Sequence, residues 1–212
     1  MAQNDLYNEE TISKAINTKW AGKTVHFARE TDSTNLWGKR AWREEGAGHG
    51  ELFVAEYQSA GRGRFTRRWS APPDSAITMS ILICPEFSPQ KAPMLTLVMG
   101  LSVAQAVAEL GLEVGIKWPN DVVVSRKKIC GILTEMTMKQ DKIGCAVIGV
   151  GINVNMESFP EETADKATSL YLESGHPFDR AQVVGLVMKH FEENYERFVQ
   201  TEDLSGLKPD YE

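Results

Sequence analysis

The spacing of hydrophobic and polar residues changes repeatedly along the chain, and each change marks an expected element. Apolar residues recur at helical spacing within residues 11–19, 93–110 and 179–199. Short apolar runs predict strands at residues 25–28, 52–57, 77–83, 115–118, 128–136 and 145–154. A further helix is expected to follow the N-cap candidates of residues 32–35 and to run towards Glu45, where glycines turn the chain.

The order of these elements predicts an α+β fold. Helices and strands do not alternate regularly, which favours a mixed, largely antiparallel sheet flanked by helices over a doubly wound parallel sheet. The length of 212 residues suits one sizeable domain. Residues 201–212 show no periodicity and are interpreted as the beginning of a linker.

Charge and composition exclude several classes of function. The chain has 23 basic and 29 acidic residues, a net charge of -6, whereas proteins that bind nucleic acid through their whole surface are usually basic. The three cysteines lie in apolar stretches and predict buried side chains rather than disulfides or metal ligands. The N-terminus is polar, unlike a signal peptide, and no apolar run approaches the roughly 20 residues that span a bilayer. We therefore expect a cytoplasmic protein that binds neither membranes nor nucleic acid.

One short segment concentrates positive charge in this acidic chain. Residues 61–69 read Gly-Arg-Gly-Arg-Phe-Thr-Arg-Arg-Trp and lie between two expected strands. Guanidinium groups suit bidentate contact with carboxylate or phosphate, and glycines permit close approach of a ligand. The alternatives are a solvated basic loop or an RNA-binding tract. An RNA tract would normally repeat, whereas this segment occurs once, so an anion site is the better hypothesis.

Two further segments are candidates for binding or catalysis. Residues 117–121 read Lys-Trp-Pro-Asn-Asp and place a lysine at the end of an apolar strand, where an anionic substrate would give it a partner; a strand-end turn is the alternative. Residues 149–153 read Gly-Val-Gly-Ile-Asn, and glycines inside a strand often mark the close approach of a ligand. Ser33, Thr34 and Asn35 are explained by helix capping alone, although they could also bind a polar ligand.

Known nucleotide-binding loops do not explain the arginine segment. Its glycines are too close together for a dinucleotide-binding fingerprint, and it lacks the Gly-Lys-Ser or Gly-Lys-Thr ending of a Walker loop. The sequence also offers no Ser-His-Asp or Cys-His arrangement.

Taken in order, these segments resemble the catalytic domain of biotin protein ligases, in the biotin/lipoate ligase superfamily. The matching positions follow the order of the family's motifs and cover roughly residues 32–155: Ser33-Thr34-Asn35, Gln58, Gly61 to Arg64, Arg67, Trp69, Lys117 to Asp121, Lys128 to Leu133 with Glu135, and Gly149 to Asn153. Single motifs of this length occur by chance, but the ordered set is specific.

The resemblance implies a class II synthetase-like fold and a reaction in two steps. Biotin and ATP would form biotinyl-5′-AMP with release of pyrophosphate, with Mg²⁺ as cofactor. The ε-amine of a lysine on a biotin carboxyl carrier protein or domain would then attack this anhydride and release AMP. The acceptor of the family belongs to a biotin-dependent carboxylase such as acetyl-CoA carboxylase, and a homodimer is compatible with the resemblance.

The resemblance also implies roles for individual residues. Those expected to contact biotin are Ser33, Thr34, Asn35, Gln58, Gly61, Arg62, Gly63, Arg64 and Lys117. Those expected to contact ATP or the adenylate are Arg64, Arg67, Trp69, Lys117, Asn120 and Asn153. Lys117, Arg62 and Arg64 would be the catalytic residues, and Asp121 would be a magnesium ligand.

The chain departs from the family pattern at one position in the arginine segment, where Thr66 replaces a frequent glycine. The resemblance implies a catalytic domain at residues 1–200 and a linker at 201–212 to a small β-barrel domain that this chain lacks. It also implies that no DNA-binding domain precedes residue 1. The nearest rival is a lipoate or octanoyl transferase of the same superfamily, and the arginine segment and residues 117–121 favour biotin.

Overall fold

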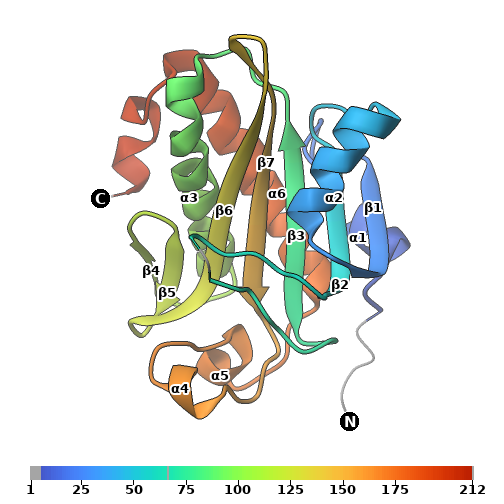
Figure 1. The fold of residues 1–212 in the computed structure, drawn as a ribbon. Coiled ribbons are helices and arrows are strands. Elements are labelled where there is room, and N and C mark those ends of the chain that lie inside the picture. Colours follow the sequence, from blue (N-terminus) through green and yellow to red (C-terminus); the bar gives the residue numbers. More distant parts are fainter. Residues whose placement is uncertain (1–5, 66, 212) are drawn as a thin grey trace.

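A computed structural model describes residues 6–65 and 67–211 (Figure 1). Its centre is a seven-stranded sheet with the order β1-β2-β3-β7-β6-β5-β4. The strands are β1 Val25–Thr31, β2 Leu52–Gln58, β3 Ala76–Ile83, β4 Val114–Lys117, β5 Asp121–Val124, β6 Lys127–Lys139 and β7 Lys142–Asn153. Only β1 and β2 pair in parallel, and the other neighbours are antiparallel. The predicted mixed, largely antiparallel sheet is confirmed.

Helices cover both faces of this sheet (Figure 1). They are α1 Glu9–Ala15, α2 Thr34–Arg40 with a π-helical turn Ala41–Glu45, α3 Leu95–Glu109 after a 3₁₀ helix Pro89–Met94, α4 Glu161–Ala164, α5 Leu170–Ser174, α6 Arg180–Thr201 and a 3₁₀ helix Ser205–Asp210. Helix α2 lies on one face, while α1, α3 and α6 lie on the other. We call these the α2 face and the α6 face.

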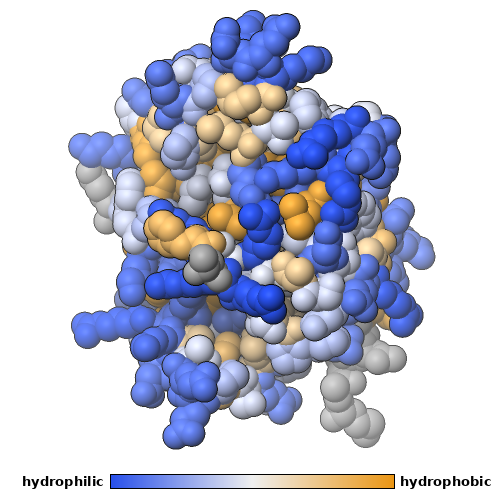
Figure 2. Space-filling view, viewed as in Figure 1, coloured by the Kyte–Doolittle hydropathy of each residue, from blue (hydrophilic) through white to orange (hydrophobic). Residues whose placement is uncertain are grey.

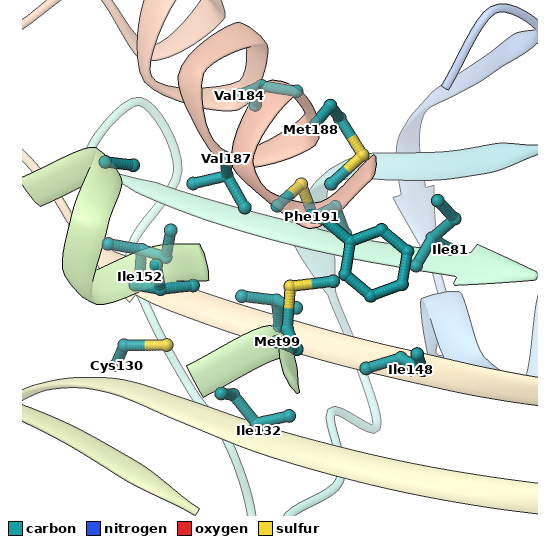
Figure 3. Packing of buried hydrophobic residues seen from close by; sticks show 14 of the residues in the cluster. Ile81, Met99, Cys130, Ile132, Ile148, Ile152, Val184, Val187, Met188 and Phe191 are labelled. Carbon is teal, nitrogen blue, oxygen red and sulfur yellow. The ribbon is translucent and has the colours of Figure 1, made fainter. Parts of the chain in front are cut away.

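Most of the hydrophobic core lies on the α6 face. Met99 of α3 and Phe191 of α6 pack against Ile148 and Ile152 of β7 (Figure 3). All four side chains are fully buried. Since successive residues of a strand point to opposite faces, the neighbouring Val147 belongs instead to a smaller apolar cluster under α2. The sheet is thus covered by apolar side chains on both faces.

Helix α3 corrects one expectation from the sequence. Together with the preceding turn it forms a continuous segment, Pro89–Glu109, of 21 residues, and its most apolar 18-residue stretch has a mean hydropathy of 1.4. By length and composition this segment could cross a membrane. The expectation that no apolar run approaches that length was therefore wrong. The structure accounts for the hydrophobicity of this segment, because it packs between the sheet and α6 and 67% of its most apolar stretch is buried.

Other differences concern short elements. Strand β5 was not predicted, because its four residues follow directly on Pro119 and Asn120, which indicate a turn. The chain after α6 also has structure: Leu207 is fully buried, and the Tyr211 hydroxyl donates a hydrogen bond of 2.7 Å to the Leu97 carbonyl of α3. A single 3₁₀ helix is too short to produce a periodic signal in the sequence.

Candidate active site

The candidate site lies on the α2 face, where β3, β7 and β6 meet the N-terminus of α2. The loop between β2 and β3, residues 59–75, crosses in front of these strands (Figure 1); we call it the covering loop. Figure 2 shows the same face, with strongly hydrophilic side chains beside exposed hydrophobic ones across its middle. A cavity of about 170 Å³ lies beneath. Its lining includes Ser33, Thr34, Asn35, Gln58, Arg62, Gly63, Arg64, Arg67, Arg68, Trp69, Asn120, Asp121, Lys128, Gly131, Gly149 and Gly151.

Two glycines of β7 create the space for this cavity. By strand alternation, Gly149 and Gly151 follow Val147 on the α2 face. A Cβ on Gly149 would come 2.2 Å from the Asn35 side-chain oxygen, and a Cβ on Gly151 would come 2.3 Å from the Trp69 ring. Only glycine at these positions lets an amide and an indole lie directly against the strand. The sequence indicated close approach here, and the approaching groups are the protein's own side chains.

A network of neutral polar groups forms one end of the cavity. The Gln58 side-chain oxygen accepts hydrogen bonds from the Thr34 backbone N–H at 2.7 Å and the Thr34 hydroxyl at 3.1 Å. The Ser80 hydroxyl lies 2.7 Å from both Thr34 Oγ1 and Asn35 Oδ1. Ser33 is the N-cap residue of α2 by position, but its side chain makes no capping hydrogen bond. Its residue type is therefore not explained by capping, and it lines the cavity.

The covering loop folds over the cavity as a small hairpin. Arg62 and Arg68 form an antiparallel bridge, and the Gly63 N–H donates to the Arg67 carbonyl at 2.9 Å. Two arginines fasten the hairpin to the sheet region. Arg62 Nη1 lies 3.1 Å from Glu135 Oε1, and Arg64 Nη1 donates to Asn120 Oδ1 at 3.1 Å. Thr66, the departure from the family pattern, lies outside the described residues.

Positive charge dominates the lining of the cavity. Among the described lining residues, the side chains that carry charge at neutral pH are Arg62, Arg64, Arg67, Arg68, Lys128 and Asp121. Five cations and one carboxylate surround this space in a chain whose net charge is -6. A low-dielectric cleft with one sign of charge attracts ligands of the opposite sign. The predicted local concentration of positive charge is present.

The cation of the sheet that reaches the cavity is Lys128. Its Nζ lies 2.7 Å from Asp121 Oδ1, at the point where β5 pairs with β6. Lys117, the predicted catalytic residue, is exposed at the end of β4 and is not in the cavity lining. Trp118 beside it is 62% exposed. The structure therefore does not bring Lys117 to the other candidates, and its place is taken by a lysine eleven residues later in the chain.

Two other candidates hold backbone rather than facing the cavity. The Asn153 amide donates to the carbonyls of Thr168 at 3.0 Å and Lys128 at 3.5 Å, and its side chain is buried outside the lining. Gly61 is also outside the lining; its carbonyl accepts the Trp69 backbone N–H at 3.1 Å, which closes the base of the hairpin. Both residues act on the site through a neighbour. Asn153 supports the strand that carries Lys128, and Gly61 fixes the position of Trp69.

Trp69 presents a free donor at the cavity. Its indole packs over Gly151 and Gly131, and its Nε1 is buried without a hydrogen-bond partner among the described residues. Buried donors of this kind are nearly always paired in native proteins. An acceptor on a bound ligand would satisfy this one.

Asp121 and Asn120 contribute side-chain oxygens to the lining of the cavity. No group of three or more His, Cys, Asp or Glu side chains that could hold a metal occurs among the described residues, so this part of the chain offers no complete cage of its own. Magnesium is usually held by one or two carboxylates together with substrate phosphates. Asp121 fits that mode. It would hold Mg²⁺ with phosphate oxygens completing the coordination.

The acidic groups around the site stay ionised. Burial opposes the charge of Glu135, but hydrogen bonds from Asn35 and Lys39 and the charges of Lys39 and Arg62 hold its pKa below the usual value. Asp32, just before the polar network, accepts two hydrogen bonds from Arg40, which lower its pKa to about 2. Both carboxylates therefore remain fixed anions that position cations at neutral pH.

The residues that form this site fall within a known protein family. The model of the biotin/lipoate A/B protein ligase family matches residues 27–153, which contain every candidate residue of the site. The chain belongs to this family. It is similar to the bifunctional ligase/repressor BirA of Bacillus spizizenii, with 43% identity over 195 residues, 91% of this chain and 60% of that protein. It is also similar to the biotin–[acetyl-CoA-carboxylase] ligase of Mycobacterium tuberculosis, with 36% identity over 68% of this chain and 53% of that protein.

A solved structure supports the same relationship for the fold. The biotin protein ligase from Aquifex aeolicus in complex with biotin and ATP superposes with a TM-score of 0.75 and 34% identity, covering 90% of this chain and 77% of that one. The chain spans 60% of the length of its Bacillus spizizenii relative. The family and the fold of this chain are thus established.

Three residues of the site, Lys128, Glu135 and Ser80, were assigned no role from the sequence. Lys128 and Glu135 lie within the motifs that carry the family resemblance, but neither was given a role. Lys128 is two residues before buried Cys130, and a charged group so close to the core needs a partner. Ser80 lies in a run of apolar strand residues, Ala76–Ile83, where a fully buried hydroxyl must find a hydrogen bond. Thr78 and Ser80 are the polar residues of this strand, and by alternation both lie on the α2 face, which was the available signal.

Proposed function

We propose that this chain is the catalytic part of an ATP-dependent biotin protein ligase. The observation that carries the proposal is the division of the cavity. Neutral hydroxyls and amides from Ser33 to Asn35 and from Gln58 form one end, and five cations surround the remainder. A ureido head group with a carbonyl and two N–H groups matches the first part, and a carboxylate beside a triphosphate matches the second.

In the first step the biotin carboxylate oxygen bonds to the α-phosphorus of ATP, and the bond to the pyrophosphate oxygen breaks. Negative charge is conserved but moves onto the leaving pyrophosphate. Lys128, Arg62 and Arg64 are placed to stabilise that charge as it shifts, and fixed cations in a partly enclosed site do so without reorganisation. Mg²⁺ held with Asp121 would neutralise phosphate charge when the nucleotide is bound.

In the second step the ε-amine of an acceptor lysine bonds to the acyl carbon of biotinyl-5′-AMP. The bond to the phosphate oxygen breaks, AMP leaves, and the amine loses a proton. We infer that the acceptor is a carrier domain of a biotin-dependent carboxylase, in keeping with the printed name of the Mycobacterium tuberculosis relative. The covering loop supports this sequence of steps, since an acyl adenylate must be kept from water until the acceptor arrives.

The competing substrate within the family is lipoate. Its dithiolane head lacks the hydrogen-bonding groups of a ureido ring, so Thr34, Asn35 and Gln58 would be left without ligand partners. A site built to hydrogen-bond a substrate rejects an analogue that lacks those groups strongly. The similarity to a structure that contains biotin and ATP favours the same choice.

Pyrophosphate exchange tests the proposal directly. The purified chain is incubated with ATP, Mg²⁺ and labelled pyrophosphate, and label entering ATP is measured with biotin, with lipoate and without acid. We expect exchange that depends on biotin. Exchange with lipoate but not with biotin would contradict the substrate, and no exchange with either acid, from a folded protein, would contradict the activity.

A further inference from the structure

Glu135 lies just outside the cavity, and two cations share one of its oxygens. Glu135 Oε1 is 3.0 Å from Lys39 Nζ of α2 and 3.1 Å from Arg62 Nη1 of the covering loop. The other oxygen, Oε2, accepts a hydrogen bond of 2.9 Å from the Asn35 amide. This carboxylate therefore joins the covering loop, helix α2 and the polar network that forms one end of the cavity.

The three charged side chains differ in burial and in reach. Those of Lys39 and Glu135 are only 14% and 18% exposed, whereas that of Arg62 is 45% exposed. Arg62 lines the cavity, but Lys39 and Glu135 do not. Lys39 and Glu135 thus form a fixed pair behind the site. Arg62 is the more exposed partner, and it is the one that reaches the cavity.

Sharing the carboxylate has an energetic consequence. Removing the only partner of a buried charge is strongly unfavourable, because the remaining charge is left without compensation. If Arg62 alone neutralised Glu135, its movement towards a ligand would carry that penalty. Lys39 removes the penalty, since Glu135 stays paired when Arg62 leaves. Two cations, Lys39 and Arg62, share one carboxylate, so one positive charge is not neutralised. The negative charge of an anionic ligand would neutralise it.

We infer that Glu135 is a positioning residue that holds Arg62 ready over the empty site, and that Lys39 weakens this hold enough for Arg62 to transfer to the carboxylate of the entering acid. The inference rests on the proposed function for the identity of that acid. It assigns opposite effects to the two partners of one ion pair. Loss of Glu135 frees Arg62, and loss of Lys39 ties Arg62 to Glu135.

Stopped-flow binding of biotin, followed by tryptophan fluorescence, tests the inference. We expect Lys39→Met to slow association about threefold or more, because Arg62 must now break an ion pair that no other cation replaces. We expect Glu135→Gln, which keeps the hydrogen bond with Asn35, to leave association as fast as in the unmodified protein or faster, and to speed dissociation of biotin about threefold or more. Lys189→Met is the matched control, because Lys189 pairs with Glu109 on the α6 face.

A double-mutant cycle separates this mechanism from a general loss of positive charge. In an Arg62→Met background, Lys39→Met should no longer slow association, since nothing remains to be released. If Lys39→Met slows association equally with and without Arg62, Lys39 acts only by attraction and the inference is wrong. Slower association in Glu135→Gln would also overturn it. The cycle does not need Glu135→Gln, so it decides the matter even if that variant fails to fold. Absence of saturable biotin binding in the unmodified protein would instead count against the proposed function.

Discussion

The Trp69 indole occupies the space that a side chain at position 151 would fill. A Cβ built on Gly151 would lie 2.3 Å from Cε2 of the ring. The ring comes from the covering loop, and the glycine comes from the centre of the sheet, so this contact seats the loop on the cavity. The backbone N–H of Trp69 donates a hydrogen bond to the carbonyl of Gly61 on the other side of the hairpin.

Gly151→Ala should therefore displace Trp69, and with it the covering loop, from the sheet. The added methyl would clash with the Trp69 ring, whose position is fixed by the Trp69 backbone. The ring also lies against Gly131, so it cannot shift in that direction to avoid the methyl. We expect biotin affinity to fall about tenfold or more, which corresponds to roughly 1.4 kcal/mol. Isothermal titration measures it. Gly115→Ala, where the Cβ meets only Val123 at 3.4 Å, is the control. Equal biotin affinity in Gly151→Ala and the unmodified protein would show that binding does not depend on the contact between Trp69 and Gly151.

Replacing Lys128 and replacing Lys117 should have different effects on adenylate synthesis. Lys128→Met should lower the rate of biotin-dependent pyrophosphate exchange about a hundredfold or more, the size typical of losing one group that stabilises developing charge. Lys117→Met should leave the rate close to that of the unmodified protein, because Lys117 is exposed and outside the cavity lining. A large loss in Lys117→Met with a normal rate in Lys128→Met would restore the assignment expected from the sequence.

The motifs of the site could be predicted from the sequence, but the exact cation could not. Ser33, Thr34, Asn35, Gln58 and the arginines of the covering loop line one cavity, because α2 begins and β2 ends beside it and the covering loop continues from β2. Lys117 ends one apolar run, and Lys128 begins another. Which one reaches the cavity depends on the pairing of β4, β5 and β6, and β5 was not foreseen.

Ser80 should contribute to both stability and binding. Its hydroxyl lies between Thr34 and Asn35 and is fully buried. Ser80→Ala leaves a buried oxygen of Asn35 without this partner, which costs about 1–3 kcal/mol. Urea unfolding measures the loss, and Ser88→Ala, at an exposed position, provides the control. An unchanged midpoint with unchanged biotin affinity would mean that the Thr34–Asn35 arrangement is held without Ser80.

The larger elements of the fold could be predicted because their periodicity extends over many residues. Helices α3 and α6 and strands β2, β3, β6 and β7 lie where the apolar spacing places them. Short elements such as α4 and the 3₁₀ helix Ser205–Asp210 could not, since one turn gives no period. The latter is held by tertiary contacts, chiefly buried Leu207 and the bond from Tyr211 to Leu97.

The ion pair between Asp32 and Arg40 predicts a pH dependence of stability. Hydrogen bonds from Arg40 lower the pKa of Asp32 to about 2, below the value of about 3.9 for an unfolded chain. A depressed pKa adds stability that is fully present above about pH 4 and is lost as the pH falls towards 2. The stabilities of the unmodified protein and Asp32→Asn, measured by urea unfolding, should therefore differ most at pH 6, differ less at pH 3 and converge only near pH 2. The difference will be modest because both side chains are about 40% exposed. A constant difference across this range would contradict the role of the charge.

Native mass spectrometry tests most directly whether this cavity makes and keeps an acyl adenylate. The chain is incubated with biotin, ATP and Mg²⁺, freed of small molecules by rapid gel filtration, and analysed intact. The account predicts one bound biotinyl-5′-AMP per chain in the unmodified protein and none in Lys128→Met. Protein that carries only ATP or only biotin, with no adenylate after either short or long incubation, would contradict it.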